Sequence, residues 1–171
     1  GLYFRQGQVL LKRDEDDTLH LPPVKNALHY VFRMEGRDYF LCQAPESLDG
    51  FAWEPVRPLR QLVSKEVCFA IMTGWHLHNW YTANRFCGRC GKETIHDDKE
   101  RMLRCPECGN MIFPRINPAV IVAVTDGDRL LLSKYANRNH TRYALLAGFT
   151  EIGETAEQCV QREVMEEVGL H

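Results

Sequence analysis

Two pairs of cysteines constrain the fold of this chain more than any other feature. Cys87 and Cys90 form one Cys-x2-Cys pair, and Cys105 and Cys108 form a second, with the fourteen residues 91–104 between them. Four thiolates can surround one Zn²⁺ as a tetrahedron that leaves no coordination position open. The spacing therefore predicts a structural zinc site that ties this segment into a compact unit.

Other uses of these cysteines fit the sequence less well. A redox Cys-x-x-Cys motif needs only one pair, and two disulfides are unusual in the cytosol. Glycine follows each pair, at Gly91 and Gly109, where a zinc knuckle needs a tight turn. His96 lies between the pairs and is interpreted as a loop residue, since four thiolates already complete the shell. The remaining cysteines are expected to be core or incidental residues: Cys42, Cys68 and Cys159.

A cluster of glutamates lies within residues 148–170, which read GFTEIGETAEQCVQREVMEEVGL. Glu163 and Glu167 are four residues apart and share one helical face, while Glu166 flanks them. Like charges at this spacing destabilise an isolated helix, so their placement suggests a compensating cation. Hard divalent cations take such oxygen ligands and commonly share them with substrate phosphates. The alternative, a solvated charged face, explains the helix but neither the preceding glycine-rich loop nor the arginine.

The same segment carries signals for both ends of a helix. Thr155 can cap its start, and Gly169 is a natural stop. Cys159 is expected to be a small core residue rather than a nucleophile. It borders a predicted buried stripe of residues that recur at every fourth position: Ala156, Val160, Val164 and Val168.

Composition restricts the class of protein further. Hydrophobic residues make up 44% of the chain and charged residues 26%, as in ordinary soluble proteins. The net charge of −2 argues against a general polyanion-binding protein. No apolar run approaches the roughly 20 residues that cross a bilayer, and residues 1–6 do not resemble a signal peptide. Together with thiols that need a reducing compartment, this favours a cytoplasmic protein without membrane contact.

The remaining pattern predicts a mixed α+β chain. Short strands are expected at residues 3–11, 28–33 and 38–42, with the acidic run 14–17 as a solvated hairpin loop. Residues 65–84 show a helical pattern whose aromatic side chains are expected in the core or at an interface.

Beyond the cysteines, the expected order is strand, turn, strand, loop, strand and helix. Residues 119–124 are a β-branched run typical of a buried strand, and residues 129–133 return after a turn at 125–128. A basic polar loop at 137–142 leads to residues 143–147 and then to the glutamate-bearing helix.

Residues 148–170 resemble the Nudix box, G-x5-E-x7-R-E-U-x-E-E-x-G-U, where U is a bulky aliphatic residue. The ribbon of cysteines, the Pro-Arg-Ile-Asn-Pro at 114–118 and the box follow an amino-terminal α+β region. That order resembles the NADH pyrophosphatase branch of the Nudix hydrolases. The box matches at every fixed position: Gly148, Glu154, Arg162, Glu163, Val164, Glu166, Glu167, Gly169 and Leu170.

The resemblance implies three parts. Residues 1–83 would form an N-terminal α+β domain, residues 84–114 a zinc ribbon, and residues 115–171 the first part of a Nudix α/β/α sandwich. The branch also has a downstream proline- and tryptophan-rich specificity segment and a further metal-binding glutamate. Neither is found before His171, so we expect a C-terminally truncated chain.

The resemblance also implies residue roles. Glu163 and Glu167 would be the main ligands of a catalytic Mg²⁺ or Mn²⁺, with Glu166 contributing or orienting. The backbone carbonyl of Ala147 would be a further ligand, and a glutamate of the box could take a proton from the attacking water.

Two further pairs of residues have implied roles. Phe113 and Phe149 would stack on the bases of a dinucleotide, although either ring could simply belong to the core. Arg162 and Glu154 would form an ion pair that braces the loop against the helix.

The implied activity is hydrolysis of the pyrophosphate of NADH or NAD to (reduced) nicotinamide mononucleotide and AMP, with possible removal of NAD caps from RNA. Metal-assisted attack of water at phosphorus would carry it out, in a homodimer that holds structural zinc. One alternative is a Nudix hydrolase for another nucleoside diphosphate derivative such as ADP-ribose. A less favoured one is a non-catalytic ribbon module that binds nucleic acid or protein.

Overall fold

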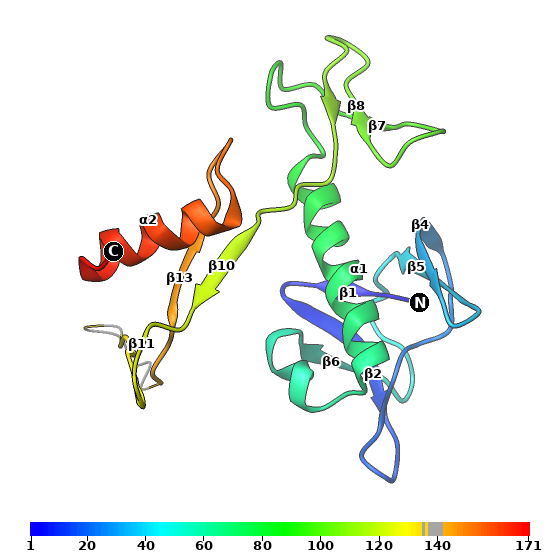
Figure 1. Cartoon of the computed structure of the whole chain (residues 1–171). Coiled ribbons are helices and arrows are strands. Elements are labelled where there is room, and N and C mark those ends of the chain that lie inside the picture. Colours follow the sequence, from blue (N-terminus) through cyan, green and yellow to red (C-terminus); the bar gives the residue numbers. More distant parts are fainter. Residues whose placement is uncertain (135, 137–141) are drawn as a thin grey trace. The chain divides into compact units, whose positions relative to one another are not determined.

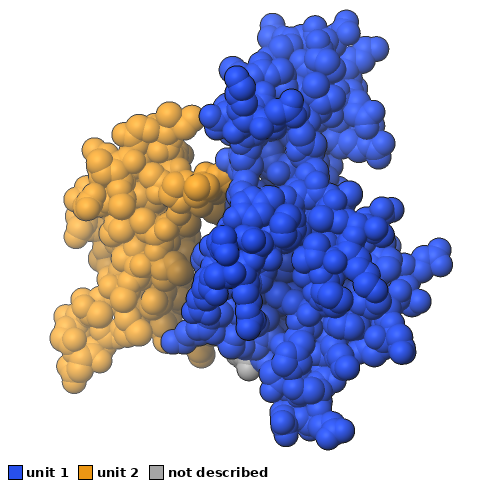
Figure 2. Space-filling view, turned by 90° about the vertical axis from the view of Figure 1, so that its right-hand side faces the viewer, with its two compact units in different colours: residues 1–114 blue, residues 115–171 orange. Residues whose placement is uncertain are grey.

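The computed structural model of the 171-residue chain describes residues 1–134, 136 and 142–171. The chain divides into two compact units, residues 1–114 and residues 115–171 (Figures 1 and 2). Both units contain strands and an α-helix, which confirms the predicted mixed α+β class. The basic loop expected at 137–142 lies, apart from Arg142, outside the described residues.

The first sheet of unit 1 is antiparallel and centred on β2 (Gln8–Arg13). Strands β1 (Phe4–Arg5), β3 (Leu19–His20) and β6 (Ala52–Pro55) all pair with β2. The single strand predicted at 3–11 is wrong, because the chain reverses at Gln6 and Gly7, with φ of 47° and 80°. Glycine adopts such positive φ values readily, and a polar residue before it completes a two-residue hairpin turn.

The second hairpin of unit 1 agrees with the sequence pattern. Strands β4 (Ala27–Met34) and β5 (Arg37–Cys42) pair around Glu35–Gly36, whose φ values are 48° and 75°. The acidic run 14–17 is the expected exposed hairpin loop. There the Asp14 side chain accepts backbone hydrogen bonds from Asp16 and Thr18, which fixes the turn.

Helix α1 (Lys65–Ala83) supplies the core of unit 1, after a short 3₁₀ helix at Arg57–Gln61. The Ser64 hydroxyl caps α1 by accepting from the Val67 N–H at 3.3 Å. The prediction that the aromatic side chains of this helix lie in the core is confirmed for Trp80, which is 6% exposed, and for Trp75 and Tyr81, which are partly buried against the same cluster. The helix packs closely on the amino-terminal strands through Gly74, where a Cβ would lie 2.5 Å from Leu2 Cδ1.

Unit 1 ends in a small three-stranded antiparallel sheet that carries the cysteine pairs. Its strands are β7 (Ile95–His96), β8 (Leu103–Arg104) and β9 (Met111–Ile112), each of two residues. Strands this short have little stability of their own, so the sheet depends on the cysteine site and on packing.

Unit 2 places helix α2 (Ala156–Val168) on a two-stranded sheet of β10 (Ala119–Val122) and β13 (Leu146–Phe149). Between them lies the short hairpin β11 (Thr125–Asp126) and β12 (Arg129–Leu130). Neither helix of the described chain has the length and apolar character needed to cross a membrane.

The buried stripe predicted on α2 needs correction. Ala156 is exposed, Val160, Val164 and Val168 are half-buried, and Cys159 alone is fully buried on this helix. Because the described sheet under α2 has two strands, it fully covers only the row nearest its centre. Cys159 is therefore the small core residue that the sequence predicts.

Candidate functional site

The four cysteines converge on one point of unit 1. Their sulfur atoms all lie within 4.8 Å of one another, with 3.7 Å between Cys87 and Cys108 and 3.4 Å between Cys90 and Cys105. A tetrahedral Zn²⁺ with bonds of about 2.3 Å separates its sulfur ligands by roughly 3.8 Å. The arrangement therefore fits zinc, as the spacing predicts.

Backbone N–H groups of the knuckles favour the thiolate form of these cysteines. The Arg89 N–H points to Cys87 Sγ at 3.4 Å, and with the N–H of Cys90 it lowers the pKa of Cys87 to about 6. The φ values of Gly91 and Gly109, 75° and 69°, confirm the tight turn after each pair. Backbone N–H groups also lower the pKa of Cys105, whereas the neighbouring thiols raise the pKa of Cys90 to about 12.

His96 needs a correction. It is a strand residue of β7 rather than a loop residue, and its ring stacks on His29 with centroids 4.1 Å apart. It lies outside the four-sulfur group, as predicted.

Helix α2 begins and ends where the sequence predicts. The Thr155 hydroxyl accepts from the Gln158 N–H at 3.2 Å, and Gln158 Oε1 accepts from the Thr155 N–H at 2.8 Å. This reciprocal capping box is visible in the sequence as Thr-x-x-Gln. Gly169 ends the helix with a left-handed φ of 69°. Both caps fix the position of the glutamates in between.

Arg162 joins the loop, the strand and the helix in one network. Its Nε and Nη2 donate to the two oxygens of Glu154 at 2.8 and 2.9 Å, which confirms the predicted ion pair. Its Nη2 also donates to the Phe149 carbonyl at 2.9 Å. Nη1 donates to Glu163 at 2.8 Å and to Glu166 at 3.3 Å, and the second contact is an i,i+4 pair on the helix. Bidentate geometry makes the Glu154 pair the strongest of these.

Glu163 lies directly against strand β13. Its side chain is 13% exposed, and a Cβ built on Gly148 would overlap its carboxylate. Glycine at this position therefore forms a cradle in which the carboxylate lies beside the strand backbone, next to Ala147. Oxygen donors at such a place suit Mg²⁺ or Mn²⁺.

The structure does not bring all three glutamates together. Within the described residues, the cysteines form the only set of three or more metal-binding side chains whose ligand atoms lie within 4.8 Å. Glu163 and Glu166 contact Arg162, which supplies the positive charge that like-charged carboxylates need. A metal site from Glu163, Glu166, Glu167 and the Ala147 carbonyl stays a prediction.

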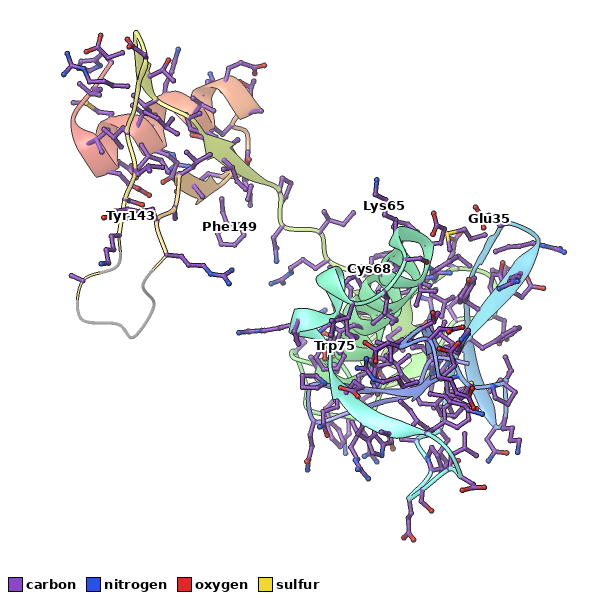
Figure 3. All side chains as sticks on the ribbon, turned by 90° about the horizontal axis from the view of Figure 1, so that it is seen from below. Glu35, Lys65, Cys68, Trp75, Tyr143 and Phe149 are labelled. Atoms are coloured by element: carbon purple, nitrogen blue, oxygen red, sulfur yellow. The ribbon has the colours of Figure 1, made fainter. Side chains whose placement is uncertain are left out.

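An open hollow adjoins this network in unit 2. Phe149 is 67% exposed there and projects from β13, so it is no core residue (Figure 3). Phe113 is 54% exposed and belongs to unit 1, and its role stays a prediction. The hollow has a volume of about 830 Å³ and is lined by residues 115–118, residues 149–152 and Glu154.

Replacing Gly148 by alanine tests the cradle. The added methyl group would displace Glu163, and overpacking of this kind costs about 1–3 kcal/mol of unfolding free energy. Urea denaturation measures the loss. Gly88→Ala is the matched control, because a Cβ there meets no heavy atom within 4 Å. Equal stability of the two variants would contradict the close contact between Gly148 and the Glu163 carboxylate.

The Arg162–Glu154 pair predicts a pH dependence of stability. Hydrogen bonds from Arg162 lower the pKa of Glu154 from 4.5 to about 2. The pair therefore stabilises the fold above pH 4.5, and this contribution is lost as pH falls toward 2. We expect Arg162→Gln to destabilise the protein more at pH 6 than at pH 3, as measured by thermal unfolding. Arg129→Gln, which removes an exposed pair with Asp126, should show no such difference. If Arg162→Gln lowered the unfolding temperature equally at both pH values, the ion pair with Glu154 would not be the source of this stability.

Family comparisons agree with this geometry. Residues 83–113 match the NADH pyrophosphatase zinc ribbon domain, and residues 115–171 match the NUDIX domain. The NAD-capped RNA hydrolase NudC of Pseudomonas aeruginosa is 38% identical over 148 residues, which cover 84% of this chain and 52% of that protein. The NudC of Stutzerimonas stutzeri is 36% identical over 164 residues, which cover 95% of this chain and 59% of that protein.

The second unit is thus a Nudix domain that follows a four-cysteine ribbon. The chain belongs to the NADH pyrophosphatase branch of the Nudix family. It spans about half the length of the curated relatives it matches.

Proposed function

We propose that the protein hydrolyses the pyrophosphate bond of NADH or NAD, giving (reduced) nicotinamide mononucleotide and AMP, and that it removes NAD caps from RNA. The observation that carries this proposal is the Glu163 carboxylate in the Gly148 cradle, on the same strand as Phe149, whose ring is exposed. The relatives named as NAD-capped RNA hydrolases support the same substrate class.

The proposed catalytic group consists of oxygen donors on β13 and α2. Glu163 and Glu167 would hold Mg²⁺ or Mn²⁺ with the Ala147 carbonyl, while Glu166 contributes or orients. When bound, the ion neutralises phosphate charge and lowers the pKa of a water molecule. A glutamate of the group takes the proton of the water that attacks phosphorus. Arg162 keeps the loop and helix in place through Glu154.

Phe149 is the proposed stacking residue for a base of the dinucleotide. Its exposed ring lies in the hollow next to the Arg162 network, and the Arg162 guanidinium holds its carbonyl. Stacking of a base on an aromatic ring contributes roughly 1–3 kcal/mol. Phe113 is proposed as a second stacking residue, and its exposed ring is compatible with that role.

The setting of the enzyme is proposed as well. None of the seven cysteines forms a disulfide, which is compatible with a reducing cytoplasm. We propose a homodimer, and exposed apolar side chains on α1 such as Phe69 and Met72 are compatible with a partner surface.

A substrate panel on the full-length protein tests the substrate class. With Mn²⁺ present, we expect NADH and NAD-capped RNA to be cleaved with a higher kcat/KM than ADP-ribose. A wide preference for ADP-ribose would favour the alternative Nudix activity. No cleavage of any of the three with either metal, together with RNA binding that persists in Glu163→Gln/Glu167→Gln, would favour a non-catalytic ribbon module.

A further inference from the structure

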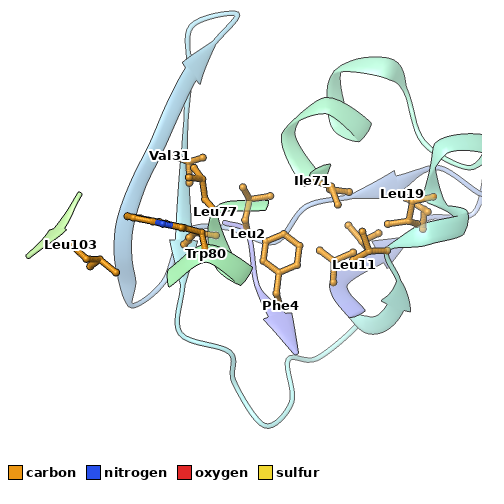
Figure 4. Packing of buried hydrophobic residues seen from close by; sticks show 13 residues of the cluster. Leu2, Phe4, Leu11, Leu19, Val31, Ile71, Leu77, Trp80 and Leu103 are labelled. Carbon is orange, nitrogen blue, oxygen red and sulfur yellow. The ribbon is translucent and has the colours of Figure 1, made fainter. Parts of the chain in front are cut away.

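The small sheet that carries the cysteines completes the core of the N-terminal region. Leu103 of β8 is 3% exposed and belongs to the same hydrophobic cluster as Val31 of β4 and Trp80 of α1. Figure 4 shows Leu103 on the outer side of Trp80, with Val31 and Leu77 nearby. Leu103 therefore closes one end of this core, and Ile112 of β9 packs against the same cluster while partly buried.

Polar and aromatic contacts surround that apolar contact. The His96 ring stacks on His29 of β4, and His29 stacks on Tyr81 of α1 with centroids 4.2 Å apart. The Arg101 guanidinium donates a hydrogen bond to the Val31 carbonyl. His96 and Arg101, like Leu103, lie between the two cysteine pairs.

The path of the chain makes these contacts depend on the cysteines. Residues 91–104 run from Cys90 to Cys105, and their only regular structure consists of the two-residue strands β7 and β8. Strands of this length are not stable alone, and structural zinc supplies the folding free energy of such units. The ion would hold both ends of the segment that packs on α1 and β4.

A buried polar group in the core favours separation of residues 95–104 from that core once the zinc site is lost. Trp80 Nε1 is buried and has no hydrogen-bond partner among the described residues. Leu103 belongs to the same buried cluster as this indole, so release of Leu103 would open that end of the core to water that can satisfy the N–H group. A groove of about 520 Å³ beside the stacked rings is lined by both the N-terminal region and the ribbon. Its lining includes Tyr81 from α1 and His96 and Leu103 from the ribbon.

We propose that the zinc site locks the N-terminal core. Zinc holds residues 95–104 against Trp80. Loss of zinc releases this segment from β4 and α1 and exposes the end of the core between them. The N-terminal region is therefore sensitive to zinc although none of the four cysteines lies in it. This inference does not rest on the proposed catalytic activity.

Hydrogen exchange measured by mass spectrometry tests the lock on the intact protein, before and after removal of zinc by a chelator. We expect exchange to rise by at least about tenfold in residues 27–34 and 75–83, as well as in the ribbon, and to recover on addition of Zn²⁺. Residues 8–13 of the central strand β2 should keep their protection.

Leu103→Ala separates the lock from metal binding. This variant should keep one zinc per chain but exchange faster in residues 27–34 and 75–83, while Ile95→Ala, an exposed apolar residue of β7, should match the parent. Increased exchange confined to the ribbon after chelation would overturn the proposal. So would a uniform increase that includes β2, because zinc would then support the whole unit. If Leu103→Ala fails to fold, the chelation result decides.

Discussion

Glu163→Gln is expected to lower kcat for NADH hydrolysis in the full-length protein by roughly 10²–10⁴-fold. The substitution keeps the shape of the side chain in the Gly148 cradle but removes the charge that would hold the metal and accept a proton. Little change in KM is expected, because the proposed base-stacking residues are untouched. Steady-state kinetics with saturating Mn²⁺ measures the effect.

Glu157→Gln is the matched control for this experiment. It makes the same chemical change on the same helix, in the first turn and on an exposed side chain. It should keep kcat within about twofold and weaken the helix only slightly, because a carboxylate in the first turn favours the helix dipole. Similar activity in the two variants would place the chemistry away from Glu163.

Cys105→Ser is expected to abolish zinc binding and the order of the ribbon. Cys105 is fully buried, and its Sγ lies 3.4 Å from that of Cys90. Structural zinc contributes about 10–16 kcal/mol of apparent free energy in small zinc-binding peptides, so a lost ligand leaves residues 84–114 without most of their stability. Zinc content by atomic absorption should fall from one equivalent to near zero.

Cys68→Ser serves as the control for Cys105→Ser. Cys68 lies half-buried on α1, outside the four-sulfur group, so this variant should keep its zinc. A Cys105→Ser protein that still holds one tightly bound zinc would show that these cysteines do not form the metal site.

The sequence predicts best those features that local spacing determines. Two Cys-x2-Cys pairs, the Thr155 cap and the Gly169 stop each depend on a few neighbouring residues, and the structure has all three. The Glu154–Arg162 pair also follows, because only seven residues of loop and helix lie between its members and the family resemblance links them.

Features that depend on tertiary packing were not visible in the sequence. Leu103 follows Met102 in the otherwise charged run 97–104, and nothing local shows that Leu103 enters the N-terminal core. The hydrogen bond from Arg162 to the Phe149 carbonyl exists because helix α2 packs on β13, whereas the contact of Arg162 with Glu166 is an i,i+4 pair that the helical spacing could have shown. Ala156 fits the helical period but extends past the sheet that covers its neighbours. The turn at Gln6–Gly7 could have been found from its glycine.

Product analysis of NADH hydrolysis in water enriched in ¹⁸O tests the central claim most directly. The full-length protein with Mg²⁺ or Mn²⁺ should release AMP and reduced nicotinamide mononucleotide, with ¹⁸O in the phosphate of one product, because water attacks phosphorus. Without a divalent metal, neither product should form. Release of nicotinamide, or ¹⁸O on a ribose carbon instead of a phosphate, would contradict the account.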